Sequence, residues 1–271
     1  MQNTVQLLLG MLLGALIAAI AWRLRSLKLS GAVAAAISGG LVFGLGGLSW
    51  AALLLAFFIS SSVLSQIFSR RKAAVDAKYS KGSQRDWGQV LANGGLGAAL
   101  AVLYGIFPQY GWIWVAFAGA MAAVNADTWA TEVGFFSAVS PRLITNGRKV
   151  EPGTSGGVTP LGYLAALCGS ALIAGLAALF TPTGNPLSLA ALITLAGVGG
   201  TTLDSLLGAT VQAIYYCPTC KKDTERHPTH TCGSHTVQTR GWRWLQNDWV
   251  NFFCSLVGAL IAAGLYRLFL Q

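Results

Sequence analysis

Residues 125–134 read NADTWATEVG, and they place two carboxylates, Asp127 and Glu132, in an otherwise apolar stretch that is long enough to cross a membrane. A carboxylate at membrane depth costs at least about 2.5 kcal/mol, so such residues usually line polar cavities. On a helix, Asn125, Thr128 and Glu132 share one stripe, with Asp127 on the next. Because Mg²⁺ prefers such oxygen ligands, this stretch predicts a divalent-cation site inside a membrane bundle. The alternative is that both acids only cap or hydrogen-bond neighbouring helices.

The composition as a whole predicts an all-α, polytopic membrane protein. The chain has 271 residues, of which 54% are hydrophobic and 10% charged, and its mean hydropathy of +0.58 argues against a soluble domain. A transmembrane helix needs roughly 20 apolar residues. Seven spans are the alternative to eight, because only Gly46-Gly47 separates the second stretch from the third. The eight predicted spans form a single integral membrane domain over 1–271, at residues 4–21, 31–47, 49–67, 91–107, 111–131, 158–180, 188–213 and 249–270.

The Lys and Arg residues predict how the bundle is oriented. Seventeen of the 18 fall in the four loops that follow the first, third, fifth and seventh predicted spans, and Arg267 is the exception. Positively charged loops tend to stay in the cytoplasm, so we expect an outside amino terminus and an inner-membrane protein whose polar end faces the cytoplasm. The net charge of +9 then reflects topology and a surface for anionic lipid or phosphate, and no nucleic-acid binding is predicted. Residues 1–21 lack a charged start and a cleavage site, so we expect them to stay as a helix.

A second polar interruption, LDSLLGATVQ at residues 203–212, places Asp204 in the seventh predicted span. Thr201, Asp204 and Gln212 share one helical face, and Ser205 is adjacent to it. Asp204 is expected in the same membrane half as the two acids of the fifth span, which favours one shared Mg²⁺ site. A packing residue bonded to a neighbouring helix is the alternative for Asp204.

The stretch EPGTSGGVTPLG at residues 151–162 predicts a phosphate-binding loop directly before a span. Glycines let the backbone approach a ligand closely, and successive N–H groups at a helix start form an anion cradle. The lysine and the spacing of a Walker loop are absent, and a flexible Gly-Pro hinge is the alternative. The candidate contacts to phosphate are Gly153, Ser155, Gly156 and Thr159.

Basic and amide side chains near these segments are candidates for binding phosphate. Arg85 and Asn93 recur near helical spacing at the start of the fourth predicted span, so both are expected on one face entering the bundle. The alternative for this pair is a solvated juxtamembrane helix at the lipid headgroups. Arg148 and Lys149 directly precede the glycine-rich stretch and are further candidates.

The loop at residues 214–248 contains a Cys-x-x-Cys pair followed by further cysteine and histidine residues at the spacing of a zinc knuckle. A closed tetrahedral site has no open position for catalysis, so its expected role is to fold a cytoplasmic loop that has little apolar core. Unligated thiols are the alternative, and His227 and His235 compete for the fourth ligand position. The predicted zinc ligands are Cys217, Cys220, His230 and Cys232.

Four motifs together resemble a known family. They are NADTWATEVG, PGTSGGVTPLG, LDSLLGATVQ and RGWRWLQNDWVNFFCSLVGALIA, and they resemble the integral membrane family that contains transmembrane protein 19 and the phytyl-phosphate kinase of the plant vitamin E pathway. The resemblance implies transfer of a phosphoryl group from a nucleoside triphosphate, CTP or ATP, to an isoprenyl monophosphate of the phytyl or geranylgeranyl type. It carries over site roles to Asn125, Asp127, Thr128, Glu132, Gly153, Ser155, Gly156, Thr159, Asp204, Ser205 and Gln212.

Phosphoryl transfer between two anions needs charge neutralisation and in-line positioning more than a strong nucleophile. We therefore expect three acids, Asp127, Glu132 and Asp204, to hold one or two Mg²⁺ ions, and the basic candidates to stabilise the transferred group. Two other classes compete with a kinase: a secondary transporter with an intramembrane carboxylate site, and a noncatalytic membrane scaffold with structural zinc. The predicted outer half is almost wholly apolar, which counts against a transport route.

Overall fold

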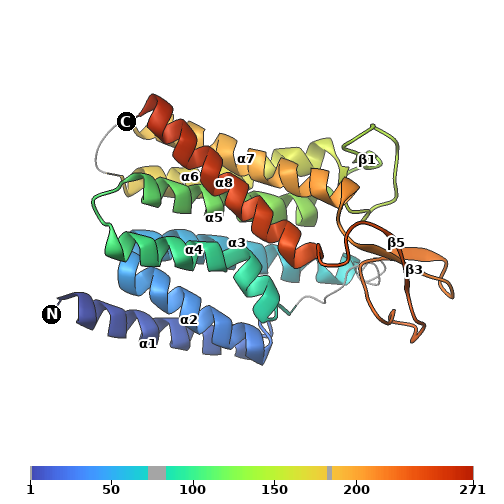
Figure 1. The fold of residues 1–271 in the computed structure, drawn as a ribbon, viewed down its shortest axis with the longest axis horizontal. Coiled ribbons are helices and arrows are strands. Elements are labelled where there is room, and N and C mark those ends of the chain that lie inside the picture. Colours follow the sequence, from blue (N-terminus) through green and yellow to red (C-terminus); the bar gives the residue numbers. More distant parts are fainter. Residues whose placement is uncertain (1, 73–83, 182–184, 271) are drawn as a thin grey trace.

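The structure is a computed structural model that describes residues 2–72, 84–181 and 185–270. Its architecture is a bundle of long helices with short strands at one end (Figure 1). Within the described residues, the helices are α1 (Gln2–Arg23), α2 (Leu29–Gly46), α3 (Leu48–Lys72), α4 (Trp87–Ile106), α5 (Trp112–Gly134), α6 (Pro160–Leu179), α7 (Pro186–Thr210) and α8 (Asn247–Phe269). The strands are β1 (Arg142–Leu143), β2 (Gly157–Val158), β3 (Ile214–Cys217), β4 (Lys222–Thr224) and β5 (Val237–Arg240). The predicted polytopic helical bundle is confirmed.

Among the described helices, seven are long and apolar enough to cross a membrane, and α5 is the exception. It corresponds to the predicted span 111–131 and carries both acids of the NADTWATEVG motif. An unbroken buried run extends from Val115 to Ala126, and the helix packs against α3, α4, α6, α7 and α8. Because these neighbours shield α5 from lipid, it tolerates polar residues that a lipid-facing helix would expose at high cost.

Local capping sets the helix boundaries where they differ from the predicted spans. α4 begins at Trp87, four residues before its predicted span, because Asp86 Oδ1 accepts from the Gln89 N–H at 3.1 Å and Gln89 Oε1 accepts from the Asp86 N–H at 3.2 Å. α6 begins directly after Thr159, whose hydroxyl caps its first turn. Gly47 takes φ +82°, a conformation that favours glycine, and ends α2 at the predicted break.

The start of α1 and the end of α8 lie at one end of the bundle, and the strands lie at the other (Figure 1). We call the strand-bearing end the loop end, because the α1–α2, α5–α6 and α7–α8 connections lie there. The start of α4 joins them: the Lys28 N–H donates to the Arg85 carbonyl at 2.9 Å, and the Arg85 N–H donates to the Ser26 carbonyl at 3.1 Å. The second predicted basic loop, which follows the third predicted span, falls largely at residues 73–83, outside the described part of the chain. Which membrane face the loop end meets stays a prediction.

Small residues let the inner helices approach one another closely. A Cβ atom added at Gly119 of α5 would lie 2.5 Å from the Gly258 carbonyl oxygen of α8. One added at Gly200 of α7 would lie 2.5 Å from the Cβ of Ala123 on α5. Such contacts are typical of membrane helices, whose association depends on close van der Waals packing. They hold α5, α7 and α8 against one another below the loop end.

The strands cover the loop end in two small antiparallel units. β1 pairs with β2, and a second sheet has the order β4-β3-β5. β5 is attached to the bundle by Arg240, whose guanidinium donates to the carbonyls of Gly208 and Ala209 at 2.7 Å each. These carbonyls belong to the last turn of α7, where helical partners are missing and a cation is favoured. Arg240 therefore holds the second sheet against the end of α7.

Candidate functional site

A polar cavity of about 470 Å³ opens at the loop end of the bundle. Six helices, α3 to α8, contribute to its wall, together with the α5–α6 connection. This volume lies in the range of small-molecule sites, roughly 300–1,000 Å³. Most of the residues predicted for a site are in this wall: Arg85, Asn93, Asp127, Thr128, Glu132, Gly153, Ser155, Gly156, Thr159, Asp204, Ser205 and Gln212.

Three acids from two helices meet in the cavity. Asp127 Oδ1 accepts from the Thr201 hydroxyl at 3.0 Å, and Glu132 Oε1 accepts from the Ser65 hydroxyl at 2.9 Å. Asp204 Oδ2 is buried and has no hydrogen-bond partner among the described residues. A buried carboxylate oxygen without a partner is costly, so it indicates a ligand. The structure thus brings together the acids of two motifs that are more than 70 residues apart in sequence.

A fourth acid, Glu225, was not predicted. It follows β4 in the Cys/His loop and lines the same cavity. Glu225 Oε1 accepts from Gln212 Nε2 at 2.8 Å and from the Ser155 hydroxyl at 2.9 Å. Glu225 and Asp127 both lie close enough to Asp204 for their negative charges to repel a charge on its carboxylate. Sequence alone gave no signal for Glu225, because its position depends on how the loop folds back over the bundle.

Two amides on α8 were also missed. Asn247 and Asn251 line the cavity from the first turns of that helix. They are four residues apart, so they share one helical face. Their spacing of four residues could have identified them, because both lie in the motif RGWRWLQNDWVNFFCSLVGALIA.

The glycine-rich segment forms the wall next to the start of α6. Gly153 and Gly156 take φ +79° and +81°, conformations that favour glycine. The Thr159 hydroxyl accepts from the Gly162 N–H at 3.0 Å and caps α6, whose first turn lines the cavity. A helix start carries partial positive charge and free N–H donors. The segment therefore presents the chemistry of an anion site.

Arg85 supplies a half-buried positive charge to the cavity. Its Nη2 donates to the Ser61 hydroxyl at 2.9 Å, and its guanidinium lies 5.6 and 5.7 Å from the ring centres of Phe57 and Phe58. Burial lowers the pKa of Arg85 to about 10, while the charge of Glu132 acts in the opposite direction. Arg85 is therefore still protonated at neutral pH. Its contacts with two aromatic rings stabilise a cation away from bulk water.

Three predicted residues lie outside the cavity wall. Asn125 is fully buried, donates to the Gly169 carbonyl at 2.7 Å and accepts from the Ser60 hydroxyl at 3.0 Å, so it joins α5 to α6 and α3. Arg148 and Lys149 are exposed in the connection between β1 and β2. Helical stripes and closeness in sequence predicted these positions, but the depth of Asn125 and the direction of the β1–β2 hairpin separate them from the acids.

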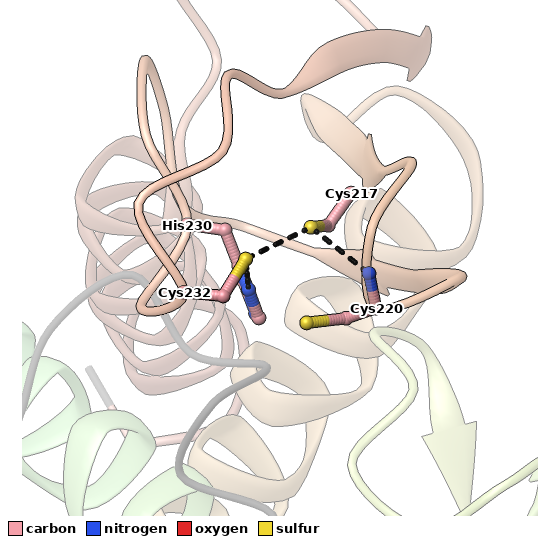
Figure 2. A group of neighbouring side chains, drawn as sticks. All are labelled: Cys217, Cys220, His230 and Cys232. Carbon is pink, nitrogen blue, oxygen red and sulfur yellow. Dashed lines mark hydrogen bonds between the residues drawn. The ribbon is translucent and has the colours of Figure 1, made fainter.

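The Cys/His loop forms a compact cluster of ligand atoms. Figure 2 shows the four side chains pointing toward one another. Their sulfur and nitrogen ligand atoms all lie within 4.8 Å of one another, and they are the predicted set Cys217, Cys220, His230 and Cys232. Neither competitor belongs to the cluster: His227 stacks on Tyr215, with ring centres 4.4 Å apart, and the backbone of His235 forms a β-bridge with Thr229. Three thiols and one imidazole are a common ligand set of structural zinc.

Comparison with known proteins agrees with the resemblance that the four motifs gave. The family described as integral membrane protein DUF92 matches residues 12–259. The chain belongs to this family. The DUF92 match includes the whole cavity and the Cys/His cluster.

Three relatives of this DUF92 chain span most of its length. Protein PGR of Arabidopsis thaliana is 33% identical, with 95% of each chain covered. The uncharacterized membrane protein MJ0933 of Methanocaldococcus jannaschii is 30% identical over 77% of this chain and 84% of its own. The uncharacterized membrane protein sll0875 of Synechocystis sp. is 30% identical over 82% of this chain and 78% of its own. No solved structure matches the chain.

Proposed function

We propose that the protein is a membrane kinase that transfers a phosphoryl group from a nucleoside triphosphate to an isoprenyl monophosphate, giving the diphosphate. One observation carries this proposal. A single cavity combines converging carboxylates, a half-buried arginine and a glycine-rich helix start, which together suit metal-bound phosphates. The motif resemblance to the phytyl-phosphate kinase family supplies the reaction class.

The acids fit a divalent cation. Asp127 and Asp204 lie close enough for their charges to interact, and Asp204 Oδ2 has no hydrogen-bond partner among the described residues. Oxygen ligands from one or two carboxylates, completed by phosphate and water, are the usual environment of Mg²⁺. Asp127, Asp204 and Glu132 would hold such an ion, and a bound ion would neutralise charge on the donor phosphates.

The other groups of the cavity would position two anions for in-line transfer. An oxygen of the isoprenyl phosphate attacks the terminal phosphorus, the bond from that phosphorus to the bridging oxygen breaks, and the nucleoside diphosphate leaves. The attacking oxygen is already ionised, so no general base is needed. Backbone N–H groups of residues 153–159 would bind phosphate oxygens, and Arg85 would stabilise charge on the transferred group.

The location of the cavity suits a substrate with a lipid tail. The cavity lies where the helices end, so a phosphate can sit among the loops while an isoprenyl chain lies between helices or in lipid. The loop end also carries most of the described Lys and Arg residues, which favours the cytoplasmic face of the inner membrane, where a nucleotide is available.

The two competing classes fit the same observations less well. Away from the loop end, apolar side chains such as Phe117, Ile173 and Ile193 form the main cluster of the described core, which counts against a polar route for a transporter. A scaffold in which the acids only pack would give no reason for the buried oxygen of Asp204 that has no hydrogen-bond partner in the described part of the chain.

The decisive experiment uses the full chain purified into lipid nanodiscs. Labelled ATP or CTP is supplied with Mg²⁺ and with phytyl, geranylgeranyl or farnesyl monophosphate, and labelled diphosphate is the expected product. Asp204→Asn should abolish turnover, whereas Asp223→Asn, which changes an exposed acid outside the cavity, should not. Substrate uptake into sealed proteoliposomes without any diphosphate, or full turnover in Asp204→Asn, would refute the proposal.

A further inference from the structure

The segment that carries Glu225 is enclosed between two ligands of the Cys/His cluster. Glu225 lies five residues after Cys220 and five before His230. The cluster and the cavity therefore share one short piece of chain. A metal bound to the cluster would close this piece into a loop and reduce its conformational entropy, so less entropy would be lost when Glu225 docks into the cavity.

The rest of the loop has few interactions of the kind that fold a domain. β4 is short, its first two residues are exposed, and among the described residues its strand partner is β3 alone. The described contacts of the segment include the stacking of His227 on Tyr215 and the hydrogen bond from the Thr236 hydroxyl to the Arg226 carbonyl at 2.9 Å. Segments with so little buried apolar surface depend on metal or disulfide cross-links for their order. The four ligand atoms are the cross-link that this segment offers (Figure 2).

Electrostatics gives a reason why Glu225 needs such support. Its charge and that of Asp127 both oppose a charge on Asp204. A loop free to move would release Glu225 to water, because like charges at close range repel. Two hydrogen bonds to Glu225 oppose this repulsion, one donated by Gln212 and one by Ser155.

We propose that the Cys/His cluster binds a structural zinc ion whose role is to hold Glu225 in the cavity as a carboxylate of the divalent-cation site. The role of Glu225 as a cation ligand rests on the proposed function, because the divalent-cation site is part of it. Glu225 is then a positioning and cation-binding residue that sequence motifs did not identify. Loss of zinc from the cluster would weaken Mg²⁺ binding in the cavity, although no zinc ligand lies there.

The test measures binding of Mn²⁺, as a paramagnetic substitute for Mg²⁺, to the full chain in nanodiscs by electron paramagnetic resonance. Glu225→Gln and Cys232→Ser should each weaken Mn²⁺ binding roughly 10-fold, as is typical when support of a metal site is removed. The double variant should be no weaker than the weaker single variant, because both changes remove the same carboxylate. Cys168→Ser, a cysteine outside the cluster, is the matched control and should bind normally.

Metal analysis accompanies the titration. The starting protein and Cys168→Ser should carry one zinc per chain, and Cys232→Ser should lose it. Because Cys232→Ser can also fail to fold, Gln212→Ala tests the other side of Glu225: it should weaken Mn²⁺ binding and keep its zinc. Unchanged Mn²⁺ affinity in either Glu225→Gln or a folded, zinc-free Cys232→Ser would overturn the proposal.

Hydrogen exchange separates this inference from the proposed function. Zinc loss should speed exchange at residues 153–159, because Ser155 contacts Glu225. If the starting protein binds no Mn²⁺ but zinc loss still speeds exchange there, the cation site fails and the positioning role stands. If exchange is unaffected by zinc, the positioning role fails whatever the kinase assay gives.

Discussion

Gly156 gives the sharpest test of the cavity, because its backbone conformation and its surroundings both require glycine. It has φ +81°, and a Cβ atom added there would lie 2.5 Å from Ala209 Cα, with the Ala209 nitrogen at least as close. Ordinary contact begins at 3.4 Å, so Gly156→Ala must move the glycine-rich segment by about 1 Å, because neither backbone can yield as a flexible side chain would. A displacement of this size costs roughly 100-fold in rate when it misplaces reacting groups.

Gly147→Ala is the matched control for Gly156→Ala. Gly147 also has positive φ, +69°, but an added Cβ meets nothing within 4 Å, and the residue lies outside the cavity wall. Both substitutions carry the cost of about 1–2 kcal/mol for alanine in a left-handed conformation. The assay is kcat/KM for diphosphate formation in protein of matched helical content. Equal activity of the two variants would show that the position of the segment is irrelevant to the reaction.

Two further substitutions probe residues that the cavity includes or excludes. Arg85→Gln should lower kcat roughly 100- to 1,000-fold, because it removes a positive charge aimed at the transferred group, whereas the exposed Arg148→Gln should retain its rate in the same assay. Asn125→Ala should cost about 1–3 kcal/mol of stability, seen as a lower melting temperature, because buried partners on α6 and α3 lose their hydrogen bonds. Its rate per folded molecule should be unchanged, and a large loss of rate would place Asn125 in the reaction instead.

Sequence reasoning worked best where hydrophobic length and helical period decide the structure. It predicted the eight helices and placed Asp127 and Asp204 on helices that meet, because a charge at membrane depth needs a polar neighbour. It also chose the four ligands of the Cys/His cluster from spacing alone. The helices and the Cys/His spacing depend on residues close together in sequence, whereas the pairing of Asp127 with Asp204 followed from the cost of an isolated charge in the membrane.

What sequence reasoning missed depends on depth and on long-range folding. A helical stripe predicts which face of the helix Asn125 occupies but not how far it lies from the cavity. Asn125 lies deeper in the bundle than Thr128 and Glu132, and there it bonds to α6 and α3. Lys149 is near the glycine-rich segment in sequence, but the β1–β2 hairpin turns it to solvent. Glu225 reaches the cavity only because its loop folds over α7, which no local pattern encodes.

The path of the chain has a practical consequence for experiments in whole cells. α1 starts and α8 finishes at the pole opposite the cavity (Figure 1). Compartment-sensitive reporters fused to the two termini should therefore give matching signals, and this comparison checks the topology without disturbing catalysis. Protein tethered to a surface by either terminus would likewise leave the mouth of the cavity open to solution.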